Sequence, residues 1–124
     1  MKRNQSKEDY LEAILILSQE QEYVHQIEVA RKIGVSQPAV QKALKILKAE
    51  ELILVDGLHI YLTARGKAYA EEVFSRHKII RDFLVLHGVD FQTADEDACE
   101  MEHAISEKTF NVIKLFVEKN KNAE

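Results

Sequence analysis

The sequence has one cysteine, one proline, four glycines and no tryptophan among its 124 residues. A single cysteine cannot form a disulfide within the chain, which favours a cytoplasmic protein over a secreted one. The sequence contains no run of eighteen apolar residues, so we expect no membrane span. Its N-terminus also lacks the apolar segment of a secretion signal. Because glycine and proline are the strongest helix breakers, their scarcity predicts a mainly α-helical fold.

Basic residues are concentrated in one part of an acidic chain. The net charge is -4, but the stretch from Val29 to Ala49 contains no acidic residue. Its basic residues are Arg31, Lys32, Lys42, Lys45 and Lys48. The position of charge along a chain is more informative than its total, so this stretch indicates a nucleic-acid surface despite the negative net charge.

The same stretch contains a predicted helix-turn-helix. A short helix is expected over residues 26–33, with Ile27, Ala30 and Ile33 facing inward. Gly34 should end it, and Ser36 should cap a second helix that has Pro38 in its first turn. In this second helix the expected inward residues are Val40, Ala43, Leu44 and Leu47. The expected outward residues are Gln37, Gln41, Lys45 and Lys48.

Two short β-type runs follow, in "LILV-DG-LHIYL". Asp56-Gly57 between them predicts a hairpin with a type I′ turn. Before the helix-turn-helix, a helix is expected from Ser6, with Asp9 as a capping-box partner. Its apolar side comprises Leu11, Ile14, Leu15 and Leu17. Helix, turn, helix and hairpin form the order of a winged helix-turn-helix.

The remainder of the sequence predicts three more helices. The first is capped by Thr63 and runs to about His87, with Ala70, Val73, His77, Ile80 and Leu84 as its apolar stripe. The second is capped by Thr93 with Glu96, and its inward residues are Ala98, Met101 and Ile105. The third begins near Ser106 and buries Phe110, Ile113 and Val117. The predicted fold class is mainly α, with a winged helix-turn-helix domain over 1–63 and a helical domain over 64–124.

The candidate DNA-binding surface is the outward face of the second helix of the motif. Glutamine suits adenine edges or the DNA backbone, and lysine suits phosphates or guanine. The residues that we assign to this surface are Ser36, Gln37, Pro38, Ala39, Gln41, Lys42, Lys45 and Lys48. The alternative is an ordinary solvated polar face. The wing has only His59 as a cation near its tip, so we expect it to serve mostly in packing.

Metal-ligand residue types occur in three separate predicted helices. The first helix carries Asp9 and Glu12, the long helix after the hairpin carries His77, and the next carries Cys99, Glu102 and His103. Thiolate, imidazole and carboxylate together suit a first-row dication. Each residue has a simpler interpretation: a capping partner, a surface acid, a core histidine or a small buried hydrophobe.

Two other interpretations of Cys99 remain. Cys-x-x-Glu-His resembles the His-x-x-Glu-His of one class of zinc peptidases. The first histidine is missing and the chain is small for a substrate cleft, so we expect no enzyme. A reactive redox thiol is the third alternative, although neighbouring carboxylates disfavour the thiolate.

Several motifs together resemble the metal-dependent repressors typified by the diphtheria toxin repressor and the manganese transport regulator (the DtxR/MntR family). The resemblance covers nearly the whole chain. Its motifs are "EDYLEAI", "VARKIGVSQPAVQKALKIL", "LTARGKAYA", "RHKIIRDFL" and "ACEMEHAIS". In that family these correspond to the opening helix, the helix-turn-helix, the segment after the wing and the two metal-binding helices.

The resemblance implies a ligand set and a cofactor. Asp9 and Glu12 fall on ligand positions of the manganese type, and Cys99 falls on a ligand that is cysteine in the iron type. His77, Glu102 and His103 match ligands of both types. The implied cofactor is Mn(II) or Fe(II), with Co(II) or Zn(II) binding in vitro. Arg81 stands where iron-type members have an acid of a second site, and Asp95 lies at another position of that site. A two-metal site using Glu12 and His77 remains an alternative.

The resemblance also implies a function. Members are homodimers, joined through their C-terminal helices, that bind double-stranded, pseudo-palindromic operators. The expected function is metal-dependent repression of metal-uptake genes, with no membrane and no small-molecule substrate as partner. We expect no SH3-like third domain, because the sequence ends soon after the last predicted helix. The alternative is a metal-independent winged-helix regulator whose C-terminal helices only dimerise.

Overall fold

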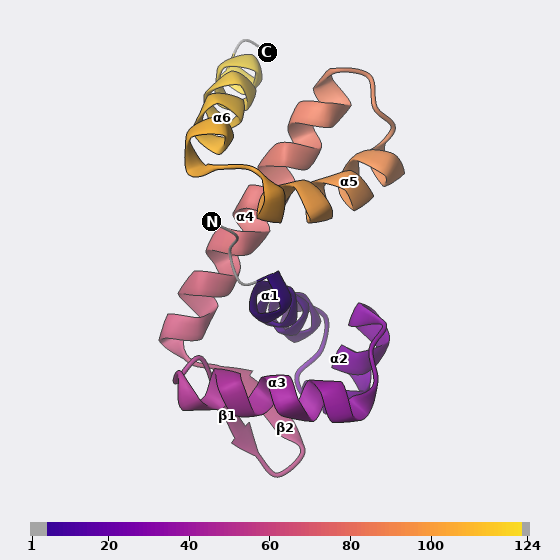
Figure 1. The fold of residues 1–124 in the computed structure, drawn as a ribbon, viewed down its shortest axis with the longest axis vertical. Helices are drawn as coiled ribbons and strands as arrows, with labels where there is room; N and C mark the ends of the chain where they lie inside the picture. The colour runs from indigo at the N-terminus through magenta and orange to yellow at the C-terminus, as the bar shows by residue number, and fades with distance from the viewer. Residues whose placement is uncertain (1–4, 123–124) are drawn as a thin grey trace. The chain divides into compact units, whose positions relative to one another are not determined.

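The computed structural model describes residues 5–122 and is mainly α-helical. Within these residues the chain forms six helices and one two-stranded sheet (Figure 1). The elements are α1 (Gln5–Glu20), α2 (Gln26–Ile33), α3 (Gln37–Ala49), β1 (Ile53–Asp56), β2 (His59–Leu62), α4 (Ala64–Leu86), α5 (Phe91–Ala104) and α6 (Glu107–Asn122). No helix of this described part is long and apolar enough to span a bilayer.

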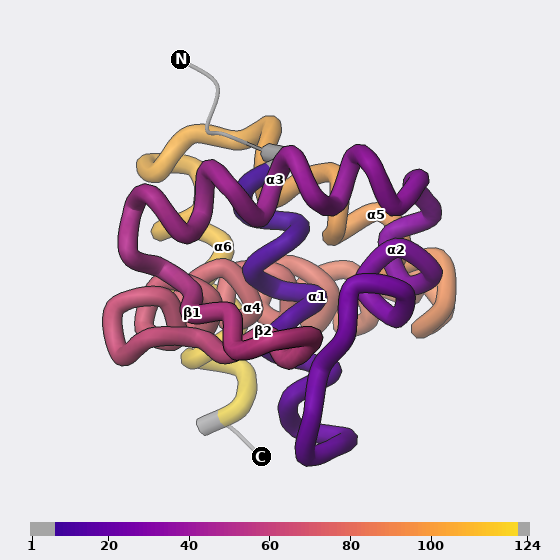
Figure 2. Tube along the Cα trace, turned by 90° about the horizontal axis from the view of Figure 1, so that it is seen from below, coloured from indigo at the N-terminus to yellow at the C-terminus, as the bar shows by residue number. Residues whose placement is uncertain are grey.

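The described residues form two compact units that divide inside α4. One unit runs from α1 to Glu72, and the other runs from Val73 through α6. In the N-terminal unit, α1 packs against α2, α3 and β2, as can be followed in Figure 2. The predicted apolar side of α1 is confirmed, because Leu11, Ile14, Leu15 and Leu17 are all buried. This core holds α3 in place and leaves its polar face outside.

The turn between α2 and α3 follows the predicted chemistry. Gly34 adopts the left-handed conformation with φ +83°, and its N–H donates to the carbonyl oxygen of Ala30 at 2.8 Å. Ser36 caps α3 by accepting a hydrogen bond from the N–H of Ala39 at 3.2 Å. The prediction for the face of α2 was partly wrong: Ile27 is 42% exposed, and Val29 is fully buried in its place.

The hairpin is confirmed, but its predicted turn is one residue too early. Asp56 pairs with His59, so Gly57 and Leu58 form the two-residue loop. Gly57 has φ +62°, whereas Leu58 does not have a positive φ. A type I′ turn needs positive φ at both loop residues, so this pattern fits a type II′ turn. Asp56 is therefore a strand residue.

The C-terminal unit packs α5 and α6 against the second half of α4. Ile80, Ala98 and Phe110 form a buried core, against which Ile79, Leu84, Met101 and Ile105 pack. Ser106 caps α6 as predicted, by accepting from the N–H of Thr109 at 3.1 Å. The predicted cap of α5 is wrong. Asp90 is the cap, because its side chain accepts a hydrogen bond from the backbone N–H of Thr93. This hydrogen bond is the main reason why the pKa of Asp90 is below its usual value.

Gly66 lies where the start of α4 passes close to the backbone of Leu52, between α3 and β1. A Cβ at this position would lie 1.8 Å from the carbonyl oxygen of Leu52, which is backbone and has little room to move. We therefore expect Gly66→Ala to lower the free energy of unfolding by about 1–3 kcal/mol, the usual cost of overpacking. Thermal or urea unfolding measures this loss. Arg65→Ala, at the exposed preceding residue, should change stability little. Equal stability of both variants would contradict the close approach.

Candidate functional site

Three side chains of the C-terminal unit converge between α4 and α5. One ligand atom each of His77, Cys99 and Glu102 lies within 4.8 Å of the other two. Cys99 and Glu102 are three residues apart and so share one face of α5, while His77 comes from α4. Glu102 is fully buried, His77 is 8% exposed and Cys99 is half-buried. We call His77, Cys99, Glu102 and the neighbouring His103 the C-terminal cluster. It is the centre of the candidate site.

His103 adjoins this group through Glu102. Its Nε2 lies 3.6 Å from Oε1 of Glu102, and its side chain is only 4% exposed. The cluster therefore places one thiol, two imidazoles and one carboxylate in a largely buried region. All four were candidate ligands from the sequence.

The other two candidate ligands belong to the N-terminal unit. Asp9 and Glu12 lie on α1 at i and i+3, so they share one face of that helix. Glu12 is 9% exposed and Asp9 is half-buried. The side chain of Ser6 lies outside the described residues, and with it the predicted capping box.

His77 has different surroundings at its two ring nitrogens. Nε2 lies 2.7 Å from Oδ1 of Asp95. Nδ1 is buried and has no hydrogen-bond partner within the described residues. Asp95 also faces Arg81, whose Nη1 lies 3.7 Å from the same carboxylate oxygen. Asp95, which the resemblance placed at a second metal site, thus contacts an imidazole and a guanidinium here.

Arg76 is a buried residue near the cluster that sequence reasoning missed. It is 3% exposed, and its Nη2 donates to the backbone carbonyl of Glu102 at 3.2 Å. It also lies 3.6 Å from the carboxylate of Glu107 and over the ring of Phe110, 4.2 Å from its centroid. Arg76 therefore links α4 to the end of α5 and the start of α6. Its place directly before His77 is the only signal in the sequence, and it does not reveal these contacts.

The donor set fits a transition-metal dication. Two ligands of one ion, each about 2.0–2.3 Å from it, can be at most roughly 4.6 Å apart. The 4.8 Å limit on the ligand atoms of His77, Cys99 and Glu102 is close to that span, so only small side-chain movements separate these three residues from a coordinating arrangement. The buried Nδ1 of His77 supplies a nitrogen with no competing partner in the described part of the chain. Thiolate and imidazole suit Fe, Co or Zn, and carboxylates extend the range to Mn.

The predicted DNA-binding surface is exposed on α3. Its exposed residues are Ser36, Gln37, Pro38, Gln41, Lys42, Lys45 and Lys48, while Ala39 is half-buried. Within residues 5–122, none of the three lysines forms an ion pair, so their charges face solvent. At the wing tip, Leu58 is 77% exposed and carries no charge. The α3 face is therefore better suited than the wing tip to phosphate contacts.

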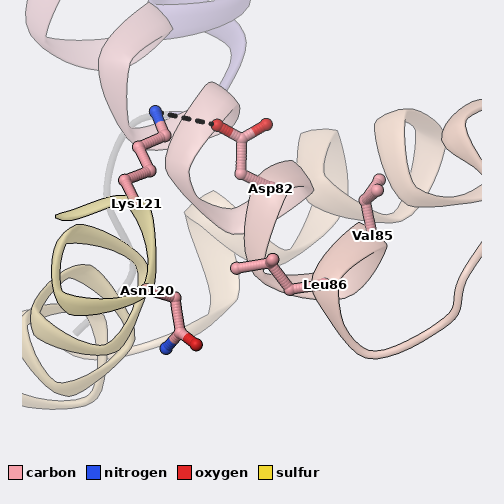
Figure 3. A pocket seen from close by; sticks show the side chains of 5 residues that line it. All are labelled: Asp82, Val85, Leu86, Asn120 and Lys121. Carbon is pink, nitrogen blue, oxygen red and sulfur yellow. Dashed lines mark ion pairs between the residues drawn. The ribbon is translucent and has the colours of Figure 1, made fainter. Parts of the chain in front are cut away.

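A shallow pocket lies between α4 and α6 on the C-terminal unit. Figure 3 shows Lys121 of α6 reaching toward Asp82 of α4, with 3.4 Å between Nζ and Oδ2. Val85, Leu86 and Asn120 complete the lining. The pocket contains none of the candidate metal ligands, and its exposed apolar residues suit contact with protein better than chemistry.

Two family models match nearly the whole chain. "Iron dependent repressor, N-terminal DNA binding domain" matches residues 4–58. "Iron dependent repressor, metal binding and dimerisation domain" matches residues 63–123. The first match contains α3, and the second contains the C-terminal cluster.

Similar proteins and structures agree with these models. The chain is 39% identical to the transcriptional regulator MntR of Escherichia coli O6:H1 over 119 residues, which are 95% of this chain and 77% of that protein. The manganese regulator SloR matches with a TM-score of 0.78 and 32% identity, over 90% of this chain and 53% of SloR. A manganese-dependent transcriptional repressor in complex with manganese matches with a TM-score of 0.80 and 27% identity, over 90% of this chain and 52% of that one. The chain thus spans about half the length of these solved structures.

Proposed function

Because the chain belongs to the iron-dependent repressor family, which includes the regulator MntR, we propose that it is a metal-dependent repressor that binds operator DNA as a homodimer. Metal-uptake genes are the proposed targets. The observation that supports this most directly is the convergence of His77, Cys99 and Glu102 within the C-terminal cluster. The same chain also exposes a basic helix-turn-helix.

We propose that Asp9 and Glu12 of α1 complete the metal site. The site would then hold side chains from both units, and its formation would favour one arrangement of α3 relative to the dimer. A bound dication would supply positive charge that offsets the three candidate carboxylates. A ligand shifts such an equilibrium only by its differential affinity for the two states. A site divided between two units meets this condition, because it is complete only when they meet.

The proposed metal is Mn(II) or Fe(II). The carboxylates of Asp9, Glu12 and Glu102 are hard ligands that suit Mn(II), whereas the thiolate of Cys99 favours softer ions. The similar structures include the manganese regulator SloR and a manganese-dependent repressor in complex with manganese, which supports this half of the proposal. The thiol keeps Fe(II), and in vitro Co(II) or Zn(II), as alternatives.

The proposed dimer joins C-terminal units. The matched model for residues 63–123 is described as a dimerisation domain. On α6, Val112 and Leu115 are 66% and 67% exposed, and they lie opposite the buried side of that helix. A two-fold dimer would present two α3 helices to half-sites one DNA turn apart, roughly 34 Å, or a multiple of it.

We expect operator binding to require metal. In a gel-shift titration performed anaerobically, the protein should bind its operator with Mn(II) or Fe(II) and release it when a chelator is added. Comparing Mn(II), Fe(II), Co(II) and Zn(II) at matched free concentrations ranks the metals. A DNA fragment without the operator is the control, because electrostatic binding to it should not depend on metal in the same way. Equal operator affinity with and without metal would contradict the proposal and favour a metal-independent winged-helix regulator.

A further inference from the structure

We propose that Asp95 is a positioning residue that holds the imidazole of His77 with Nδ1 free for a metal, and that Arg81 holds Asp95 in this role. The inference rests on the proposed function, because it assumes that the C-terminal cluster binds a metal. It concerns two residues outside the ligand set, and it explains how one ligand is kept in the tautomer that coordination needs.

The contact between His77 and Asp95 determines which ring nitrogen of His77 carries the hydrogen. A carboxylate can only accept hydrogen bonds, so the 2.7 Å contact between Nε2 and Oδ1 of Asp95 requires the hydrogen to be on Nε2. A neutral imidazole carries one N–H, which leaves a lone pair on Nδ1. That nitrogen is buried and has no hydrogen-bond partner within the described residues. Asp95 therefore selects the tautomer that directs a lone pair from a buried position.

The same contact also orients the imidazole ring of His77. Histidine ligands commonly donate their other N–H to a carboxylate, which fixes the ring and makes the ligand more basic. His77 packs beside Phe74, with 6.4 Å between the ring centroids and 27° between the ring planes. Packing against Phe74 does not determine the direction in which Nε2 points, and the hydrogen bond to Asp95 fixes this direction. Asp95 lies one turn before Cys99 on α5, so the same helix carries the orienting carboxylate and a candidate ligand.

Arg81 lies beside the carboxylate of Asp95 and supports its position. Its Nη1 lies 3.7 Å from the same Oδ1 that contacts His77, and its guanidinium lies over the ring of Phe91, 4.9 Å from the centroid. Arg81 and His77 are four residues apart on α4 and thus share a face. The fixed positive charge, which also pairs with Asp82 at 3.3 Å, attracts the carboxylate of Asp95 toward α4. It also makes a second dication beside Asp95 unfavourable, because two positive charges would compete for one oxygen.

The test uses the whole 124-residue chain and begins without metal. Nitrogen-15 NMR of histidine-labelled, metal-free protein at neutral pH should show His77 with its hydrogen on Nε2. Asp95→Ala should give a mixture of tautomers or the opposite one. Isothermal titration with Mn(II) and Co(II) should then show affinity reduced about 10- to 100-fold in Asp95→Ala. Arg81→Gln should give a smaller reduction in the same direction.

Two further variants keep the result interpretable. Asp95→Asn retains the shape of the side chain and an acceptor oxygen, so it should lose less affinity than Asp95→Ala and guards against misfolding. Asp97→Ala removes a carboxylate from the same helix at an exposed residue and should leave metal affinity within about twofold. Circular dichroism of each variant should show the helix content of the wild-type protein.

Each outcome bears on one of the two proposals. If the wild-type protein binds metal and Asp95→Ala binds it equally well, the positioning role is wrong while the metal site stands. A hydrogen on Nδ1 of His77 in the metal-free wild type would also overturn the role of Asp95. If the wild-type protein binds no metal, the proposed function itself fails, whatever the tautomer of His77.

Discussion

Glu102→Gln is expected to abolish metal-dependent operator binding. Glu102 is fully buried, its carboxylate takes part in the cluster with His77 and Cys99, and Oε1 lies 3.6 Å from Nε2 of His103. Replacing the carboxylate by an amide removes one negative charge and the one carboxylate ligand of the C-terminal cluster, while the side-chain volume stays the same. Loss of an outer-shell partner alone costs about 10- to 100-fold in metal affinity, so loss of this ligand should cost at least about 100-fold. Isothermal titration and the gel shift measure the two effects.

The fold of the Glu102→Gln protein should survive, because glutamine fills the same space. Circular dichroism should therefore show unchanged helix content in the metal-free protein. The matched control is Glu100→Gln, which makes the same change at an exposed residue of α5 and should keep both metal and operator binding. Metal-dependent operator binding by Glu102→Gln at wild-type metal concentrations would place the activating site elsewhere.

The parts of the fold that sequence predicted well depend on local chemistry. Gly34, Ser36 and Ser106 act at helix ends as expected, because each role needs only a left-handed backbone or a side-chain oxygen near free N–H groups. Two errors arose where the sequence offers two local solutions of the same kind. Both Asp90 and Thr93 have a cap-forming side chain, and the path of the chain after Gly88 decides in favour of Asp90. In the hairpin, a one-residue shift is decided by cross-strand pairing, which a dipeptide does not encode.

The candidate site divides in the same way. Cys99, Glu102 and His103 share one predicted helix, and His77 was a candidate on another. The structure shows that His77 lies beside Cys99 and Glu102 across the interface between α4 and α5. The contact of His77 with Asp95 depends on how two helices pack, which no spacing within one helix determines. The link from Arg76 to the backbone of Glu102 is equally non-local, and a buried arginine resembles a surface residue in the sequence. Spacing thus predicts ligands on one helix, whereas their supporting contacts need the tertiary structure.

Replacing Lys42, Lys45 and Lys48 together by alanine is expected to weaken operator binding more than about 100-fold at 0.15 M salt. These lysines are exposed on α3, and alanine is a good helix former, so the helix should remain. Each lost phosphate contact makes the negative slope of log K against log salt shallower by about 0.9, so the three losses should make it shallower by about 2.7 per half-site. Metal affinity should stay unchanged, because no candidate ligand lies on α3. Gel shifts at several salt concentrations measure the slope.

The control for the lysine variant removes the same charge elsewhere. Arg65 and Lys67 on α4 and Lys114 on α6 are exposed, outside the proposed DNA surface and off the α6 stripe of Val112 and Leu115, and replacing them by alanine should reduce the slope much less. Similar losses in both triple variants would mean that total charge, and not the α3 face, governs binding. A reduced slope with retained preference for the operator would assign these lysines to phosphates, whereas loss of that preference would assign at least one of them to a base edge, because only base contacts distinguish sequences directly.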